Sequence, residues 1–402
     1  MLKIKYYQKI FPLVPFLFSF YLVRFKLFGI PTNLLEFFLL TLFVLLIFTK
    51  GKKIKVPLLL PLSLFLGSGI LGILVVKFLD GNLIKSLGWW KGFMFVPTIF
   101  FVLVGNLNEK NKLKLFKNFI LSSSLLGIAS FFSTKPFTVD GRLSGFFESA
   151  NFLAFSLSPA LLMFFALNKE LILNKKKITN CFLKTISITS ILIPLFLTQS
   201  YLAISSCVLL ISLWKVLEFR EKKKFDYKIF LGIFLFLVLF IGFFYKTEKF
   251  QKAFDLKNRS SISVRAQVYR ISLDFLVQHP FLGIGLGNYE KKYLEESPEI
   301  LGHTPFEWTM RHTHNLFISI WLNIGFLGLV SFLSFFYLAI KKDLDKEKIL
   351  KIRPHLFLKS TPLFYFALHG LLDTPFWKND LGIIFFLCLG FIILDDNKKS
   401  EY

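Results

Sequence analysis

Long apolar runs separated by short charged breaks dominate this sequence, and they restrict the fold more than any other feature. A transmembrane helix needs about 20 predominantly apolar residues, so a chain of 402 residues has room for a dozen such helices with short connections. Hydrophobic residues make up 54% of the chain and charged residues only 18%, which excludes a soluble composition. We predict a single all-α polytopic membrane domain over residues 1–402.

The apolar runs give twelve candidate spans. These cover residues 10–28, 33–49, 56–76, 90–107, 115–133, 150–168, 181–198, 201–218, 229–245, 315–340, 356–373 and 380–394. The three cysteines, Cys181, Cys207 and Cys388, all lie inside apolar runs. They therefore read as packing residues and not as a disulfide framework.

Basic residues predict the orientation of these spans. Alternate short loops, starting with the N-terminal segment, hold far more Lys and Arg than the loops between them, and cytoplasmic loops carry this excess. We expect both termini in the cytoplasm and one large, partly helical loop, residues 246–314, on the outer side. The formal net charge of +24 then reflects orientation, because no basic stretch outside the apolar runs interleaves with stacking aromatics as nucleic-acid binding would require.

The large outer loop contains the pattern of an amphipathic helix. Apolar residues recur at i, i+4, i+7 and i+11, namely Val264, Val268, Ile271 and Phe275. Ser263 precedes this run as a candidate N-cap, and Pro280 ends it. We expect this helix to lie outside the membrane or on its surface.

A polar stripe follows a neighbouring face of the same predicted helix. It consists of Arg265, Tyr269 and Ser272, whereas Arg270 points elsewhere. A guanidinium fork matches a phosphate better than an ammonium group does. Arg265 is therefore a candidate diphosphate-binding residue, with contact to lipid headgroups as the alternative.

A glycine-rich turn follows this helix. Gly283, Gly285 and Gly287 occupy alternate positions and permit a tight backbone whose N–H groups can approach a phosphate. A purely structural turn is the alternative. A dinucleotide site is disfavoured, because no βαβ unit surrounds these glycines.

The loop ends in histidines that directly precede the span at 315–340. His314 is a candidate general base at the membrane surface. His312 and His314 are two residues apart, but no third ligand has suitable spacing with them, so we predict no metal site.

Charged residues outside the large loop also fall near the outer ends of spans. Arg142 lies in the loop between the fifth and sixth spans, and His369 and Asp373 lie one helical turn apart near the end of the span at 356–373. Ionisable residues at membrane depth are functional-site candidates by default, although an interfacial location would explain them without function.

Four segments together resemble the O-antigen ligase and polymerase family. They read RLSGFFESANFLAFSL at 142–157, RAQVYRISLDFLVQHPFLGIGLGNY at 265–289, HTHNLFISIWLNIGFLGL at 312–329 and HGLLDTPF at 369–376. The resemblance covers roughly residues 130–380, with the four segments and the large outer loop in family order.

This resemblance implies a GT-C-like, inverting and metal-independent glycosyltransferase that needs no cofactor. It would move a glycan from an undecaprenyl-diphosphate carrier to a hydroxyl of a lipid A core sugar, on the periplasmic side of a bacterial inner membrane. The family positions fall on Arg265 and Arg142, which would hold the diphosphate, and on His314, which would activate the acceptor. Further substrate-binding candidates are Tyr269, Arg270, Gly283, Gly285, Gly287, Arg311, His312, Asn315, His369 and Asp373.

One position departs from the family pattern. Members commonly carry Ser-Arg at the start of the span where this chain reads Gln199-Ser200-Tyr201. Either another basic residue, such as Arg311 or Arg270, substitutes for the missing arginine, or the donor differs somewhat.

Other functions stay open at this point. Within the family, the alternatives are a repeat-unit polymerase and a protein O-oligosaccharyltransferase. From another class, a secondary transporter or lipid-glycan flippase predicts internal repeat symmetry and charges near mid-membrane. The ionisable residues gather instead at one face, which favours the transferase.

Overall fold

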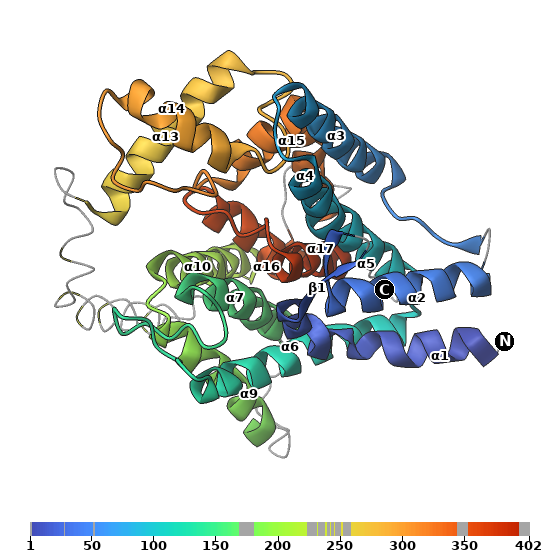
Figure 1. Ribbon diagram of the computed structural model, residues 1–402. Coiled ribbons are helices and arrows are strands. Elements are labelled where there is room, and N and C mark those ends of the chain that lie inside the picture. Colours follow the sequence, from blue (N-terminus) through green and yellow to red (C-terminus); the bar gives the residue numbers. More distant parts are fainter. Residues whose placement is uncertain are drawn as a thin grey trace.

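The computed structural model describes residues 2–27, 29–50, 53–168, 181–222, 259–343 and 353–393, and a few single positions between 231 and 251. This part of the chain is mostly helical (Figure 1). Its helices are α1 (Leu2–Ile10), η1 (Phe11–Leu22), α2 (Leu34–Lys50), α3 (Leu59–Phe78), α4 (Leu83–Trp89), η3 (Trp90–Phe95), α5 (Val96–Gly105), α6 (Glu109–Ala129), η4 (Ser130–Phe132), α7 (Ala150–Leu167), α9 (Cys181–Leu197), α10 (Tyr201–Lys222), α13 (Ser261–Gln278), α14 (Tyr289–Leu301), α15 (Leu316–Asp343), α16 (Pro354–Gly370) and α17 (Asn379–Ile393).

Among these described residues, six helices are long and apolar enough to cross a membrane. They cover Leu59–Phe78, Leu83–Gly105, Glu109–Phe132, Ala150–Leu167, Tyr201–Lys222 and Leu316–Lys341. Three shorter apolar helices cover Leu34–Thr49, Thr185–Leu197 and Asn379–Ile393. The expectation of a helical membrane protein is confirmed, and the number of twelve spans stays a prediction. Most of the predicted span at 229–245 lies outside the described residues.

The prediction of one continuous span at 10–28 is wrong. Residues 11–22 form the 3-10 helix η1, which contains Pro12 and Pro15, and proline cannot donate the backbone hydrogen bond of an α-helix. Beyond η1, β1 (Arg24–Leu27) pairs antiparallel with β2 (Ile30–Asn33). The otherwise helical molecule therefore carries one small hairpin, which brings Arg24 and Lys26 onto an exposed strand.

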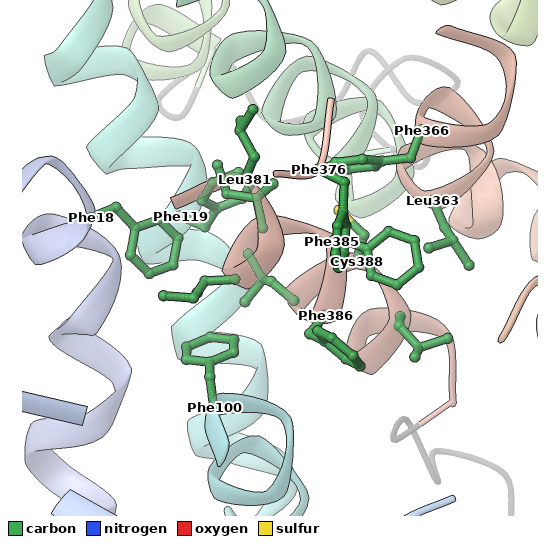
Figure 2. Close-up of a cluster of buried hydrophobic side chains, with 14 of the residues drawn as sticks. Phe18, Phe100, Phe119, Leu363, Phe366, Phe376, Leu381, Phe385, Phe386 and Cys388 are labelled. Carbon is green, nitrogen blue, oxygen red and sulfur yellow. The ribbon is translucent and has the colours of Figure 1, made fainter. Parts of the chain in front are cut away.

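Helix α17 lies at the centre of the packing. All residues from Asp380 to Ile392 are buried, as expected for a helix that is apolar on every side. Figure 2 shows Phe385 and Phe386 of this helix among Phe366, Phe376 and other side chains from neighbouring segments. Phenylalanine rings supply most of these contacts, since Phe385 meets Phe332, Phe366 and Phe376 at centroid distances of 5.0 to 5.4 Å. This core fixes the segment between α16 and α17, residues 371–378, which forms part of the site.

Helix α15 is broken near its middle, whereas the sequence predicts a continuous span over 315–340. Ile324 and Gly325 have non-helical backbone angles, and Gly325 has a φ of 74°. The break leaves backbone groups without helical partners. Part of this need is met by the preceding loop, because Phe326 donates its N–H to the Phe281 carbonyl at 2.8 Å and Ile284 donates to Leu322 at 2.8 Å.

Helices α13 and α14 form a separate small core beside the membrane helices (Figure 1). It consists mainly of Val268, Ile271, Phe275, Tyr289 and Tyr293, all of them buried. The predicted amphipathic helix is thus confirmed as α13, with its apolar face directed at α14. Within the predicted outer loop of 246–314, the structure describes residues 259–314 and position 251.

Candidate functional site

Helix α13 turns one polar face toward the segment that follows α16. Its N-cap is Ser260, whose side chain accepts from the Ser263 N–H in a capping box, so the N-cap predicted at Ser263 lies three residues too far along the chain. Arg265 donates through Nε to the carbonyl oxygen of Leu372 at 2.9 Å. The Tyr269 hydroxyl lies 2.9 Å from the His314 carbonyl oxygen. Because the opposite face of α13 is locked into its core, these two side chains are fixed in place.

His314 and Asp373 form a pair beside this face. The His314 Nδ1 atom lies 3.4 Å from Asp373 Oδ1, and His314 has a φ of 50°, a left-handed conformation that non-glycine residues rarely adopt. Strained backbone of this kind concentrates at functional sites. Burial by itself raises the pKa of Asp373, but the hydrogen bond and charge of His314, with the charges of His369 and Arg265, hold that pKa well below its usual range. Asp373 is therefore ionised at neutral pH and fixes the Nδ1 side of His314.

Arg142 approaches Asp373 from the loop before α7. Its Nε donates to the Thr198 carbonyl oxygen at 2.9 Å, and its Nη2 donates to Asn151 Oδ1 at 2.7 Å. Asn151 in turn donates to Asp373 Oδ2 at 3.3 Å. Burial lowers the pKa of Arg142, but a guanidinium stays charged in proteins. Arg142 is thus a buried, fixed cation joined to Asp373 through Asn151.

Arg142, Arg265 and Asp373 line one cavity of about 490 Å³, which we call the arginine cavity. Its lining residues are Arg142, Asn151, Ser200, Tyr201, Leu202, Ser261, Ile262, Arg265, Ala266, Tyr269, His369, Leu372 and Asp373. Five predicted site residues are therefore brought together from three separate parts of the chain. Tyr201, which stands at the position of the family arginine, lines the same cavity.

Two candidates for replacing that arginine lie elsewhere. Arg270 is exposed on α13 and is absent from the lining of the arginine cavity. Arg311 is 3.5 Å from Glu290 and lines a different cavity. Within the described part of the chain, Arg142 and Arg265 are the guanidinium groups of the arginine cavity.

Asn315 and His369 support the site in different ways. The Asn315 side chain accepts from the Phe317 N–H at 3.0 Å, and so caps the start of α15, while its Nδ2 donates to Leu371. His369 is buried with its ring 4.6 Å from that of Phe155, and its Nδ1 has no hydrogen-bond partner among the described residues. Asn315 holds the two chain segments together, whereas His369 contributes a wall of the arginine cavity.

The glycine turn packs between helices α3 and α15. Gly283, Gly285 and Gly287 all have positive φ, and the Gly287 N–H donates to the Asn323 side chain at 2.8 Å. A Cβ atom at Gly285 would lie 2.9 Å from the Gly72 carbonyl oxygen, and one at Gly283 would clash with the backbone of Leu322. These close approaches explain the glycines as packing residues. Phosphate binding by them stays a prediction, which these contacts do not support.

A second cavity, of about 910 Å³, lies between the β-hairpin, α4 and the segment before α17. Its lining residues are Arg24, Phe25, Lys26, Pro31, Thr32, Asn33, Glu36, Asn82, Ile84, Lys85, Gly88, Trp89, Phe93, Glu148, Phe152, Glu290, Arg311, His312, Trp377, Lys378 and Asn379. The predicted site residues Arg311 and His312 belong here. Burial lowers the pKa of His312 to about 4, so this histidine is neutral at pH 7.

No group of three or more His, Cys, Asp or Glu side chains that suits a metal ion occurs within the described ranges. The His312 and His314 side chains diverge, because His312 lines the second cavity and His314 faces Asp373.

Part of the site lies within a segment that matches a known family. Residues 186–333 match the family model described as O-antigen ligase. This match supports an O-antigen ligase family membrane protein. The resemblance inferred from the sequence is confirmed over this segment, and six of the described helices are long and apolar enough to cross a membrane. No curated protein matches the sequence.

The matched segment contains Tyr201, Arg265, Tyr269, the glycine turn and His314. Arg142, His369 and Asp373 lie outside it and reach the same cavity through the fold. The extent of the resemblance over 130–380 stays a prediction.

Sequence analysis missed two residues of these cavities. Asn151 joins Arg142 to Asp373, and Lys378 lines the second cavity. The sequence does mark both residues as unusual. Asn151 is a polar residue at the start of the apolar helix α7, and Lys378 is a lone basic residue between two apolar runs. Neither signal shows which residues lie opposite.

Proposed function

We propose that this protein is a membrane glycosyltransferase that moves a glycan from undecaprenyl diphosphate to a sugar hydroxyl of a lipid A core. The observation that carries the proposal is that Arg142, Arg265 and Asp373 line one cavity, with His314 held against Asp373. The site faces the periplasm in this proposal, as the distribution of basic residues predicts.

The arginine cavity binds the diphosphate of the donor. The bond between the anomeric carbon and its bridging oxygen breaks, and negative charge develops on the departing diphosphate. Guanidinium groups that already point to the place where this charge appears stabilise the transition state without a metal ion. Arg142 is pre-organised by Thr198 and Asn151, and Arg265 by Ser261 and Leu372.

His314 accepts the proton of the acceptor hydroxyl. Its Nδ1 side faces the ionised Asp373, so Nδ1 carries the hydrogen and Nε2 has the free lone pair. The acceptor oxygen attacks the anomeric carbon as its proton passes to Nε2, and the diphosphate leaves from the opposite side. This single displacement inverts the anomeric configuration, and Asp373 stabilises the imidazolium that forms.

Tyr201 defines how this site differs from the family pattern. A phenol contributes a hydrogen-bond donor but no positive charge. The donor diphosphate is therefore held by two arginines here, with Tyr201 beside them in the arginine cavity.

Transfer by the purified protein tests the proposed function. We expect an undecaprenyl-diphosphate-linked oligosaccharide to be consumed, and its glycan to appear on lipid A core, with a chelator of divalent ions present. Strict dependence on a divalent ion would remove the arginine mechanism. A deletion strain separates ligase from polymerase, because loss of attachment with normal lipid-linked polymer indicates a ligase, whereas core capped with a single repeat indicates a polymerase.

A further inference from the structure

The second cavity contains more positive than negative side chains. Arg24, Lys26, Lys85, Arg311 and Lys378 line it, against the carboxylates of Glu36, Glu148 and Glu290. Two of these carboxylates are already engaged in ion pairs. Glu36 lies 2.7 Å from Lys91, and Glu290 lies 3.0 Å from Lys85 and 3.5 Å from Arg311. The remaining balance favours an anionic ligand.

Lys378 makes no hydrogen bond or close ion pair through its ammonium among the described residues, although the charges of Asp380 and Glu148 act on it. Its Nζ is buried and has no hydrogen-bond partner within the described part of the chain. The ammonium lies 3.9 Å from the ring centre of Phe152 and 4.4 Å from that of Phe147. These rings attract the charge, but they do not replace the oxygen acceptors that a buried ammonium requires. An acidic group of a ligand would satisfy it.

His312 supplies a second unsatisfied group on the same cavity. Its Nδ1 is buried and lacks a hydrogen-bond partner among the residues described. Its ring lies 6.1 Å from that of Trp89, and Trp89 lies 5.7 Å from Trp377. The cavity thus combines flat aromatic surface with unsatisfied polar atoms, and its volume is that of a small-molecule site.

Residues that are close together in the chain line the two cavities. Asn151 lines the arginine cavity and the next residue, Phe152, lines the second cavity. Asp373 lines the first and Lys378, five residues later, lines the second. His314, beside Asp373, is only two residues from His312. The linings of the two cavities thus share two segments of the chain, and a third segment, which carries the histidine of the His314–Asp373 pair, also lines the second cavity.

We propose that the second cavity binds the acceptor, and that this acceptor is a saccharide with a carboxylate or phosphate group that pairs with Lys378. Arg24 and Lys26 of the β-hairpin extend the positive surface at the exposed rim of the cavity. The hairpin is thereby assigned to acceptor recognition. This inference rests on the proposed function, and it adds the charge of the acceptor and the place where it binds.

Matched acceptors test this inference. Purified wild-type protein would be given the same lipid-linked donor with three oligosaccharide acceptors that differ only in one sugar: glucuronic acid, glucose 6-phosphate or neutral glucose. We expect the KM for an acidic acceptor to be about tenfold lower than for the neutral one, because hydrogen bonds to charged groups are the stronger ones. The two acidic acceptors distinguish carboxylate from phosphate.

Substitutions test whether the preference for acidic acceptors depends on residues of the second cavity. Lys378→Gln should raise the KM for the acidic acceptor to that for the neutral one, with the KM for the donor unchanged. Lys26→Gln, on the exposed hairpin, should reduce the preference without any risk to the core. Lys135→Gln is the matched control, because Lys135 is exposed and lines neither cavity.

Several outcomes would overturn the inference. They are equal use of the acidic and neutral acceptors by the wild type, an equal effect of Lys378→Gln on both acceptors, and an effect on the donor KM alone. If Lys378→Gln does not fold, the Lys26→Gln result decides in the same way. If no acceptor is glycosylated, the proposed function fails, and direct binding of the glucuronate-ended saccharide to wild type and Lys26→Gln still tests the cavity.

Discussion

The polar face of α13 and the glycine turn are neighbouring stretches of the chain, and both have the composition of a phosphate site. They differ in the partners of their polar groups. Arg265 and Tyr269 line the arginine cavity. The turn at Gly283, Gly285 and Gly287 instead closes onto α3 and α15, with amides of the turn bonded to Gly72, Leu322 and Asn323. A motif of this composition can bind phosphate only where the packing of the protein leaves its hydrogen-bond donors accessible to a ligand.

The largest effect is expected at His314. In the proposed mechanism, His314→Ala removes the group that takes the acceptor proton, and we expect kcat to fall by about 10² to 10⁴. Donor binding should stay close to that of the wild type, because the arginines are untouched. Initial rates with purified variants measure this effect, and wild-type kcat in His314→Ala would remove His314 from the chemistry.

A slightly smaller effect is expected at Arg265. Arg265→Ala should lower the rate of transfer by about 10² to 10³, as removal of a pre-organised donor does. Arg265→Lys should restore little, because an ammonium cannot reproduce the guanidinium fork. The matched control is Arg270→Ala, five residues along the same helix and exposed. Equal losses in Arg265→Ala and Arg270→Ala would indicate a general effect of charge on α13 and contradict the assignment.

A substitution in the glycine turn should lower the stability of the protein and leave donor binding unchanged. Gly283→Ala places a Cβ against the Leu322 backbone at a residue with a φ of 68°, which costs at least about 1–3 kcal/mol of strain. We expect lower yield and lower melting temperature of the purified protein, while molecules that do fold keep the wild-type KM for the donor. An altered donor KM at unchanged stability would restore the glycines to the binding site.

The smallest expected effect is on stability at acidic pH, through His312. The pKa of this histidine is about 4 in the folded protein, against an ordinary value of 6.5. As the pH falls below 6.5, the unfolded chain takes up the proton first, so the folded state loses about 2 kcal/mol near pH 5 and nothing above pH 7. His312→Gln should therefore show a smaller decrease in melting temperature between these two pH values. An equal decrease in both proteins would contradict the buried, neutral His312.

Much of the fold was predictable, because long apolar runs have few solutions in a bilayer. The helix over 261–278 was also predictable, since its period of 3.6 is clear. The predicted first span is wrong, because Pro12 and Pro15 favour a 3-10 helix. The break in α15 was also not predicted, because it depends on hydrogen bonds between the backbone near Gly325 and a preceding loop. Such breaks are set by tertiary contacts that local sequence does not contain.

The sequence identified individual residues of the site, but it did not show which of them lie together in one cavity. Arg142, His369 and Asp373 were identified from charge near the ends of spans, and Arg265 from the polar stripe of a predicted helix. The fold brings all four to one cavity. Arg311 and His312, candidates on the same grounds, lie instead on the second cavity with Lys378. Charge and spacing name candidates, but only the packing of α7, α13 and α16 decides which of them meet.

The most direct test of the arginine cavity is equilibrium binding of undecaprenyl diphosphate and undecaprenyl monophosphate to the purified protein. We predict that the wild type and Arg270→Ala bind the diphosphate more tightly than the monophosphate, and that the double variant Arg142→Ala/Arg265→Ala loses this preference while it remains folded. A folded double variant that keeps the wild-type preference would contradict the account.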